Sequence, residues 1–412
     1  MLPSRRVMSG VLKRFQLSSF LAHPSRLVSA SAVLYFLHIL FQFKPAGAEL
    51  GAFFTIFLIG WAIARGDARF SFHILYFPLF VYGFASTLST AFADARIQAG
   101  FQGVLWFKML IFPAAVILLR EIPRLRELIV YAHAIFGGGM AIWGLIEFVF
   151  LGHRDLEHRI DGPTAHVMTF SGLILPLSLM FLVLWWRERK WWQLAVAVVT
   201  ATALLLTYTR SVWIGWLAAA FLVMMLGRAR LALYAVPAVI LFITFLPLNL
   251  FARLISVFDM QQTSNFDRVR MIEAGVEMIR DRPLLGVGPA NVKDAYALYR
   301  KPDAPRPRPP HLHNNIIQLW AERGVLALSA YLLLLGLFIR ECMRAWAGPR
   351  RTWAEVGVVV TVSLAVAGLF EFNFGDTEVF YLLLNLMALV VVQLERAEPA
   401  ANEALPVVVQ AA

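Results

Sequence analysis

Arg210 stands between two apolar runs, in the stretch TYTRSVWIGW. Each flanking run is barely long enough to cross a membrane, so this arginine lies close to membrane depth. A charged side chain at that depth usually faces a cavity and marks a functional path. The alternative is an arginine at a tight helix–helix turn whose long side chain simply reaches the membrane surface. Arg210 is therefore either a functional residue or an arginine that only marks a turn between two helices.

Two further arginines, Arg268 and Arg270, lie in the first turn of a predicted helix, in SNFDRVRMIEAGVEMIRDR. Cations are unusual there because the helix dipole favours anions at an N-terminus. At 100° per residue, Arg268 borders the apolar face and Arg270 points further toward solvent, so Arg268 is better placed to face an interior cleft. The alternative is a surface ion pair with Asp267 or Glu273.

A histidine pair, His311 and His313, is followed directly by Asn314 and Asn315. Histidine is suited to act as a general base because its ordinary pKa is about 6.5. The alternative is that the histidines begin a helix and share hydrogen bonds with the asparagines. A metal site needs three or more ligands, and His-x-His has no nearby cysteine or acidic partner, so no metal is expected.

Other chemistry-bearing patterns are weaker. The turn GVGP at 286–289 lacks the phosphate-binding pattern G-x-x-x-x-G-K-[ST], and no such motif occurs elsewhere, so no cofactor and no direct use of ATP are predicted. Four carboxylates near expected helix ends either line a site or pair with arginines, but helix-end carboxylates are often just solvated. They are Glu147, Glu371, Asp376 and Glu378.

The composition defines what must position these residues. Of 412 residues, 59% are apolar and 15% are charged, and the mean hydropathy is +0.68. Soluble domains are about 45–50% apolar and about 25% charged. The single cysteine, Cys342, cannot form an intrachain disulfide, which excludes a secreted disulfide scaffold. The predicted fold class is an all-α polytopic membrane protein.

A spanning helix needs about 20 mainly apolar residues, and the chain offers twelve candidates. The predicted spans are 28–43, 48–64, 70–92, 102–119, 128–151, 164–186, 192–209, 211–226, 231–250, 316–339, 353–372 and 378–395. Only Lys108 lies well inside one of them.

Lys and Arg predict the orientation, because they collect in cytoplasmic loops. With the N-terminus inside, the inner segments hold twenty of them and the short outer loops hold five. We therefore expect both termini in the cytoplasm, with the N-terminus retained as an anchor. The net charge of +11 is then a result of topology, and no nucleic-acid partner is expected.

The predicted organisation has one long connection. Helices 1–9 fill residues 1–250, helices 10–12 fill 316–395, and 396–412 form a tail. The connection 251–315 between them falls outside, which is periplasmic in a Gram-negative cell. Its amphipathic helix is expected to be capped by Ser264, Asn265 or Asp267, and the proline-rich stretch 301–310 must run extended. The face expected to be buried consists of Phe266, Val269, Ile272, Val276 and Ile279.

The order and spacing of these motifs resemble the O-antigen ligase and polymerase superfamily. RVRMIEAGVEMIRDRPLLGVGP is followed, after a gap, by HNNIIQLWAERGVLAL, and T-R-S-x-W stands at the outer start of a helix. The motifs occupy mainly 207–216 and 264–324. The sequence departs from the common pattern at Ile272, where many relatives carry an aromatic residue.

The resemblance implies transfer of a glycan from an undecaprenyl diphosphate carrier, at the periplasmic face of the bacterial inner membrane, to an acceptor. For a ligase the acceptor is the lipid A core of lipopolysaccharide. By this resemblance Arg210 and Arg268 bind the donor diphosphate, and His313 is the catalytic base of an inverting, metal-free displacement. Arg270, His311 and Asn314 are expected near the substrate, and Arg270 is the alternative to Arg268. Membrane lipids surround the helices.

Three other functions remain open from the sequence. A polymerase of the same superfamily extends the lipid-linked chain, and a protein O-oligosaccharyltransferase of that superfamily modifies a protein hydroxyl. A transporter of lipid-linked sugars belongs to another class, but such proteins tend to show paired broken helices in the two halves of the chain. That symmetry is missing here, which disfavours a transporter. The long loop, with one histidine motif after the arginine helix, favours a ligase over a polymerase.

Overall fold

The computed structural model describes residues 23–93, 105–152, 158–244, 248–256, 259 and 261–395. Every long element in these ranges is a helix. The predicted basic N-terminus (1–22) and most of the predicted tail (396–412) lie outside the described residues. The first half contains α2 (Arg26–Phe41), α3 (Pro45–Ala64), α4 (Tyr76–Ala91), η2 (Leu105–Leu110), α6 (Ile111–Glu121), α7 (Pro123–Phe150), α8 (Val167–Glu188) and α9 (Trp191–Leu206).

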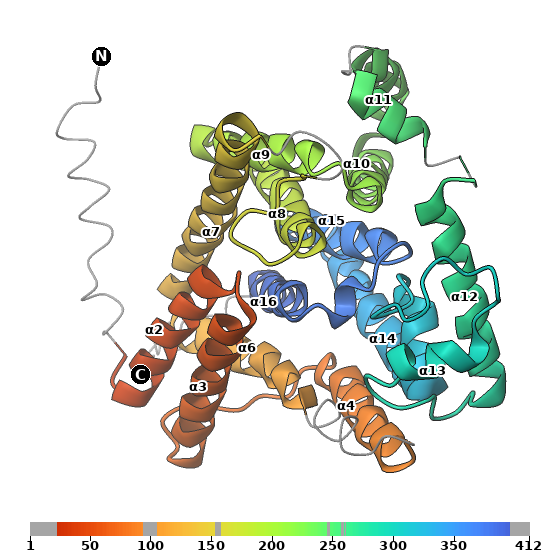
Figure 1. Ribbon diagram of the computed structural model, residues 1–412. Helices are drawn as coiled ribbons and strands as arrows, with labels where there is room; N and C mark the ends of the chain where they lie inside the picture. The colour runs from red at the N-terminus through yellow and green to blue at the C-terminus, as the bar shows by residue number, and fades with distance from the viewer. Residues whose placement is uncertain are drawn as a thin grey trace, which may run out of the picture.

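The second half continues the helical pattern, and Figure 1 shows the helices side by side. It contains α10 (Arg210–Thr244), α11 (Leu248–Ile255), α12 (Thr263–Asp281), α13 (Val292–Tyr299), α14 (Asn315–Arg344), α15 (Arg351–Ala367), η3 (Asn373–Gly375) and α16 (Thr377–Leu394). The described residues thus form an all-helical protein, as the composition predicted.

Six described helices are long and apolar enough to cross a membrane: α3, α7, α8, the first part of α10, α14 and α16. Two shorter apolar helices, α2 and α9, accompany them. Large apolar side chains such as Phe53, Phe57 and Phe80 are about half exposed on the helix surfaces, as expected of side chains that face lipid. The chain is therefore a polytopic α-helical membrane protein, and the count of twelve spans stays a prediction.

Helix α10 differs most from the predicted spans, because it is continuous where two spans, 211–226 and 231–250, were expected. A straight helix of 35 residues would be about 50 Å long. However, Arg253 donates from Nε to the carbonyl oxygen of Tyr208 at 3.2 Å. The short stretch from Thr244 to Arg253 reaches at most about 32 Å. The helix therefore cannot be straight along its whole length, but the break predicted between the two spans is not found in it.

Two other spans end differently from the prediction. The structure ends α15 at Ala367, whereas the predicted span continued to 372. A Cβ at Gly368 would lie 2.2 Å from Asn315 Nδ2, so glycine permits a close approach between this point and the start of α14. The predicted span 102–119 is η2 followed by α6, which places Lys108 in the 3₁₀ turn and not deep inside a long helix.

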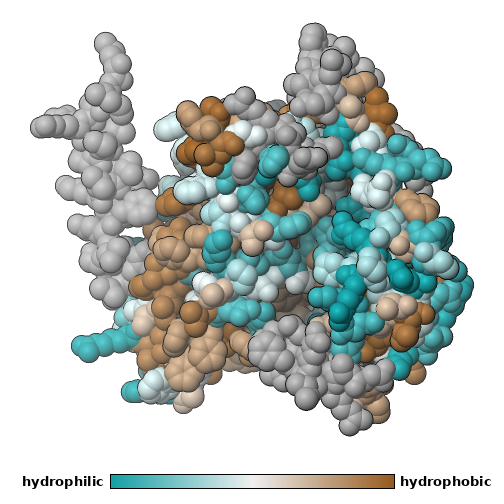
Figure 2. Space-filling model, viewed as in Figure 1, coloured by the Kyte–Doolittle hydropathy of each residue, from teal (hydrophilic) through white to brown (hydrophobic). Residues whose placement is uncertain are grey.

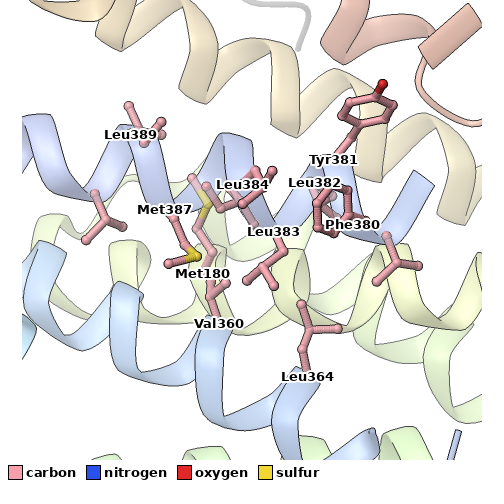
Figure 3. Packing of buried hydrophobic residues seen from close by; sticks show 14 of the residues in the cluster. Met180, Val360, Leu364, Phe380, Tyr381, Leu382, Leu383, Leu384, Met387 and Leu389 are labelled. Atoms are coloured by element: carbon pink, nitrogen blue, oxygen red, sulfur yellow. The ribbon is translucent and has the colours of Figure 1, made fainter. Parts of the chain in front are cut away.

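The buried core is centred on α16, which is covered by neighbours on several sides (Figures 1 and 3). In Figure 3, Leu383, Leu384 and Met387 of α16 lie against Met180 of α8 and Val360 of α15. All five side chains are buried. Because residues on every face of α16 are buried, this helix is a fixed support for the polar connection that precedes it.

Residues 261–314, here called the cap segment, pack on the start of α14 around a second apolar cluster. Figure 2 shows hydrophilic residues gathered over α12 and α13, whereas hydrophobic residues gather over α2 and α3. The buried residues of α12 are Asp267, Met271, Ala274, Gly275, Met278 and Ile279. The predicted apolar face was therefore wrong except at Ile279. Small residues at 274 and 275 let Leu312 and Ile317 approach the helix closely, which hydrophobicity alone did not indicate.

The predicted helix caps were also wrong. Helix α12 begins after Gln262, which makes no side-chain capping bond. Ser264 and Asn265 instead accept hydrogen bonds from Arg210. Asp267 is buried and pairs with Arg306 at 3.1 Å. These polar side chains therefore tie α12 to α10 and to the proline-rich stretch.

The turn 283–289 is joined to a kink in α14 at Gly324. The amides of Val287 and Gly288 donate to the carbonyls of Ala321 and Glu322 at 2.8 and 2.9 Å. Gly324 has φ +80°, and a Cβ there would lie 1.9 Å from the carbonyl oxygen of Leu284. The GVGP turn thus fixes the cap segment to α14 through its backbone.

Candidate active site

His313 and Glu371 form the polar pair at the end of α14 that faces the cap segment. Their Nδ1 and Oε2 atoms are 2.9 Å apart. Burial alone would raise the pKa of Glu371, but the hydrogen bond from His313, the charges of both histidines and the amide of Phe372 hold this pKa at about 2. The carboxylate is therefore ionised and can only accept. His313 must donate from Nδ1, which leaves Nε2 as the nitrogen that can accept a proton.

The backbone of His313 is in the left-handed region, with φ of 51°. This conformation is uncommon for a residue other than glycine and carries a cost that the surrounding contacts must offset. Leu312, just before it, donates its amide to Gln318 Oε1 at 2.8 Å. Asn314, just after it, caps α14 by accepting from the amide of Ile317. Contacts with α14 therefore fix the chain on both sides of His313.

The two asparagines after His313 position Glu371. Asn314 donates to the carbonyl of Leu369 at 2.9 Å, and the amide of Asn315 donates to the carbonyl of Gly368 at 2.7 Å. Asn315 Oδ1 also accepts from the amide of Phe374. The H-N-N pattern thus combines the histidine with the residues that hold its carboxylate partner. Substrate binding by Asn314 stays a prediction, since its amide group already contacts the backbone.

His311 contacts the same carboxylate. Its Nε2 lies 3.4 Å from Glu371 Oε1, and its ring is 4.2 Å from that of His313. Burial is the main cause that lowers the pKa of His311 to about 4, and the nearby Glu371 charge opposes this shift. His311 is therefore neutral at neutral pH and helps to fix Glu371 and His313.

His311, His313 and Glu371 also form a group that could bind a metal ion, because their ligand atoms lie within 4.8 Å of one another. No acidic residue lies near His311 and His313 in the sequence, but the fold brings the carboxylate of Glu371 to both histidines. In the structure, however, the hydrogen bond between His313 and Glu371 already uses one ligand atom of each residue. The metal-free mechanism stays a prediction.

Arg268 is the arginine of α12 that turns inward. Its Nε is buried and has no hydrogen-bond partner among the described residues. Burial lowers the pKa of Arg268, and the charge of Glu371 opposes this effect, so the guanidinium lies close to the His313–Glu371 pair. A buried cation without a full set of partners is costly. This arginine is therefore the best placed of the predicted residues to meet an anionic ligand.

Arg270 is engaged elsewhere. Its guanidinium pairs with Glu273 at 2.7 Å and with Asp303 of the proline-rich stretch. It also lies over the ring of Phe266 at 4.8 Å. These contacts fix the cap segment from its exposed side. They correspond to the surface ion pair that was the alternative interpretation, here found for Arg270 and not for Arg268.

Arg210 is buried, with an exposed fraction of 6%. Its Nη1 donates to Ser256 O and to Gln262 Oε1, both at 2.6 Å. Its Nη2 donates to Ser264 Oγ and Asn265 Oδ1 at 3.1 and 2.7 Å. All of these acceptors are neutral, so the bonds hold the guanidinium without cancelling its charge. Arg210 thus links the start of α10 to the start of α12.

Two arginines that the sequence did not single out complete a cationic cluster. Burial lowers the pKa of Arg253 to about 10, with further lowering by the charges of Arg210, Arg159 and Arg268. Burial and the charge of Arg268 also lower the pKa of Arg159. These four residues, here called the arginine cluster, repel one another at short range, and such an arrangement favours a bound anion.

A cavity of about 590 Å³ opens beside the histidines. It is lined by His311, His313, Glu371 and Phe372, and it extends to Lys108 of η2 and Arg323 of α14. No member of the arginine cluster is among its lining residues. Lys108 donates to Glu49 at 2.6 Å and to Thr377 at 3.2 Å. The histidine pair therefore lines a polar cavity whose wall does not include the arginine cluster.

Comparison with known proteins agrees with the motifs. Residues 195–332 match the family model described as O-antigen ligase. This stretch contains Arg210, Arg253, Arg268 and His313. No curated protein matches the chain. Residues 195–332 are thus similar to the O-antigen ligase family, in agreement with the resemblance of the sequence motifs.

Proposed function

We propose that this protein is an O-antigen ligase. It transfers O-antigen polysaccharide from undecaprenyl diphosphate to the lipid A core of lipopolysaccharide, at the periplasmic face of the bacterial inner membrane. The observation that carries this proposal is the His313–Glu371 pair with the half-buried, incompletely partnered Arg268 near it. A proton acceptor and an anion site thus lie together, which is what transfer from a diphosphate requires.

The reaction is a single displacement. The acceptor hydroxyl attacks the anomeric carbon of the donor sugar, and its proton passes to Nε2 of His313. The new glycosidic C–O bond forms as the bond from the anomeric carbon to the phosphate oxygen breaks. The electron pair of that bond leaves with undecaprenyl diphosphate, which gains a negative charge. Attack from the face opposite the leaving group inverts the anomeric configuration.

The arginine cluster stabilises the charge that develops on the diphosphate. Planar guanidiniums bind phosphate oxygens through paired, charge-assisted hydrogen bonds. Arg268 makes the direct contact, because no carboxylate pairs with it at ion-pair distance among the described residues, whereas Arg270 pairs with Glu273 and Asp303. Arg210 holds the start of α12 and contributes its charge. Such fixed electrostatic stabilisation supplies the role of a metal ion, and the activated donor removes any need for ATP.

The membrane topology belongs to the same proposal. With both termini in the cytoplasm, the cap segment and the histidine pair face the periplasm, where lipid-linked O-antigen and the lipid A core are both exposed. The exposed side of the cap segment carries arginines paired with carboxylates, such as Arg270 and Arg308. A cysteine-labelling scan from the cytoplasmic and periplasmic sides tests this orientation.

Purified protein provides the test of the activity. With undecaprenyl diphosphate-linked polysaccharide and lipid A core in detergent, a ligase forms core that carries polysaccharide. A polymerase of the same superfamily instead extends the lipid-linked chain and leaves the core unmodified. In cells, deletion of a ligase gene leaves long polymer on the lipid carrier, whereas deletion of a polymerase gene leaves core with one repeat. Either polymerase result would contradict the proposal.

A further inference from the structure

The cavity beside His313 does not include the arginine cluster among its lining residues. His313 lines the cavity, whereas Arg159, Arg210, Arg253 and Arg268 do not. In a direct displacement, the attacking hydroxyl and the leaving phosphate stand on opposite sides of the anomeric carbon. If the arginine cluster takes the phosphate, the cavity that His313 lines is left for the attacking hydroxyl. This step rests on the proposed function.

The charges in the cavity wall indicate what it can bind. Each cation of the wall is paired with a carboxylate of the protein. Lys108 pairs with Glu49 at 2.6 Å, Arg306 with Asp267 at 3.1 Å, and Arg323 with Glu322 at 3.1 Å. The wall therefore offers no cation without a carboxylate partner that would neutralise a phosphate. This distinguishes the cavity from the arginine cluster.

Hydrogen-bonding groups remain in the wall for a neutral ligand. The carboxylates of Glu371 and Asp376 line the cavity and can accept from hydroxyl groups. Neither carboxylate has a Lys or Arg ion-pair partner among the described residues, so both suit the hydroxyl groups of a polyhydroxylated molecule and repel a phosphate. The volume of about 590 Å³ is within the range of small-molecule sites.

Phe372 supplies a flat apolar surface in this cavity. Three other aromatic side chains of the wall, Tyr82, Phe374 and Phe380, are more than nine-tenths buried. Phe372 is partly exposed, follows Glu371 in the chain, and its ring is 6.0 Å from that of His311. The C–H face of a sugar ring that stacks there lies next to the catalytic histidine pair.

We propose that this cavity is the acceptor subsite, that it holds a neutral, polyhydroxylated sugar ring of the acceptor, and that Phe372 is the stacking surface that orients its hydroxyl toward His313. Phe372 is thus a specificity-determining residue for the acceptor and not for the lipid-linked donor. A phosphorylated acceptor sugar fits this wall poorly, because the cations in it are already paired.

The experiment uses the full-length protein in detergent and three substitutions of one side chain. Phe372→Leu keeps an apolar group but removes the flat ring, Phe372→Trp keeps a ring, and Phe372→Ala removes both. Phe370→Ala is the matched control, because Phe370 lies in the same connection but is exposed and does not line the cavity. Thermal unfolding of each variant shows whether it is folded before its binding is compared.

Binding is measured without turnover. The acceptor probe is a neutral core oligosaccharide, with the same oligosaccharide carrying one phosphate as its comparison, and its dissociation constant is obtained by ligand-detected NMR. The donor-side probe is radiolabelled undecaprenyl diphosphate. We expect at least about tenfold weaker oligosaccharide binding for Phe372→Leu and Phe372→Ala. Carrier binding should stay within twofold, and Phe372→Trp and Phe370→Ala should resemble the wild type.

Three results would overturn the proposal: unchanged oligosaccharide binding in Phe372→Leu, a matching loss of undecaprenyl diphosphate binding, or tighter binding of the phosphorylated oligosaccharide. The outcome is separable from that of the proposed function. If the oligosaccharide binds as expected but no transfer occurs, the ligase assignment fails while the subsite stands. If transfer occurs and Phe372→Leu has an unchanged KM for the acceptor, the subsite fails while the assignment stands.

Discussion

His313 and Glu371 are 58 positions apart in the chain, yet His313 Nδ1 and Glu371 Oε2 are joined by a hydrogen bond of 2.9 Å. The ionised carboxylate accepts from Nδ1 and leaves Nε2 as the nitrogen that can take a proton. In the proposed reaction it would also stabilise the imidazolium that forms when the acceptor proton arrives. The pair therefore has the arrangement of a general base with an orienting acid.

Glu371→Gln should lower kcat by at least about 10²-fold, because an amide neither fixes the tautomer reliably nor stabilises the imidazolium. Undecaprenyl diphosphate binding should be unchanged, which distinguishes loss of base function from loss of fold. The measurement is steady-state transfer by purified protein. Glu277→Gln, at an exposed position of α12, is the control. Wild-type kcat in Glu371→Gln would remove this residue from the mechanism.

Arg268→Ala should weaken undecaprenyl diphosphate binding by about 10–100-fold, the size expected for charged hydrogen bonds of about 1.5–3 kcal/mol. Arg270→Ala is the matched variant on the same helix. Its side chain pairs with Glu273 and Asp303, so its loss should leave carrier binding within twofold. Equilibrium binding of radiolabelled carrier measures both. If Arg270→Ala weakened carrier binding and Arg268→Ala did not, Arg270 would be the arginine of this helix that binds the diphosphate.

Gly324→Ala should severely destabilise the protein, because φ is +80° and the added Cβ would lie 1.9 Å from the carbonyl oxygen of Leu284. Gly336→Ala is the control on the same helix, since a Cβ there meets nothing within 4 Å. We expect a large drop in melting temperature and low yield for the first variant, and no loss for the second. Equal melting temperatures would show that the close contact between Gly324 and the turn 283–289 is not needed for stability.

Stability should fall as the pH falls from neutral. The pKa of His311 is lowered from 6.5 to about 4 in the folded protein, so the unfolded chain binds more protons between these values. The stabilisation is therefore complete above pH 6.5 and lost as the pH falls to 4. The pKa of Glu371 is lowered from 4.5 to about 2, which extends the loss below pH 4.5. Melting temperatures at pH 7.5 and 4.5 measure this effect.

His311→Asn is the comparison for that titration. Without the imidazole, the melting temperature should depend less on pH between 6.5 and 4, whatever its absolute value at neutral pH. An identical pH dependence in both proteins would show that His311 does not titrate as a buried, neutral group.

A chelator should not change the transfer rate, because the arginine cluster supplies the charge that a metal would otherwise provide. Added Zn²⁺ should inhibit, since the ligand atoms of His311, His313 and Glu371 lie within 4.8 Å of one another and zinc would occupy the base. Transfer assays with EDTA and with micromolar zinc test both effects. Activity that disappears with EDTA and returns with a divalent ion would contradict the metal-free scheme.

The sequence predicted the all-helical membrane fold, because long apolar runs have few alternatives in a membrane. The preference for Arg268 over Arg270 came from an apolar face that the structure does not have, so it stays a prediction. Glu371 was named only among four weak carboxylate candidates and Arg253 was not indicated, because each acquires its meaning only from a distant partner. The sequence misplaced the buried face of α12, since the close packing at Ala274 and Gly275 depends on shape and not on hydrophobicity.

The most direct test of the mechanism is the structure of the protein with an unreactive phosphonate analogue of the lipid-linked donor. We predict that the phosphate oxygens contact Arg268 within the arginine cluster, and that His313 Nε2 faces the anomeric carbon from the side of the cavity. A diphosphate bound in the cavity beside Lys108 and Arg323, with the arginine cluster empty, would contradict this account.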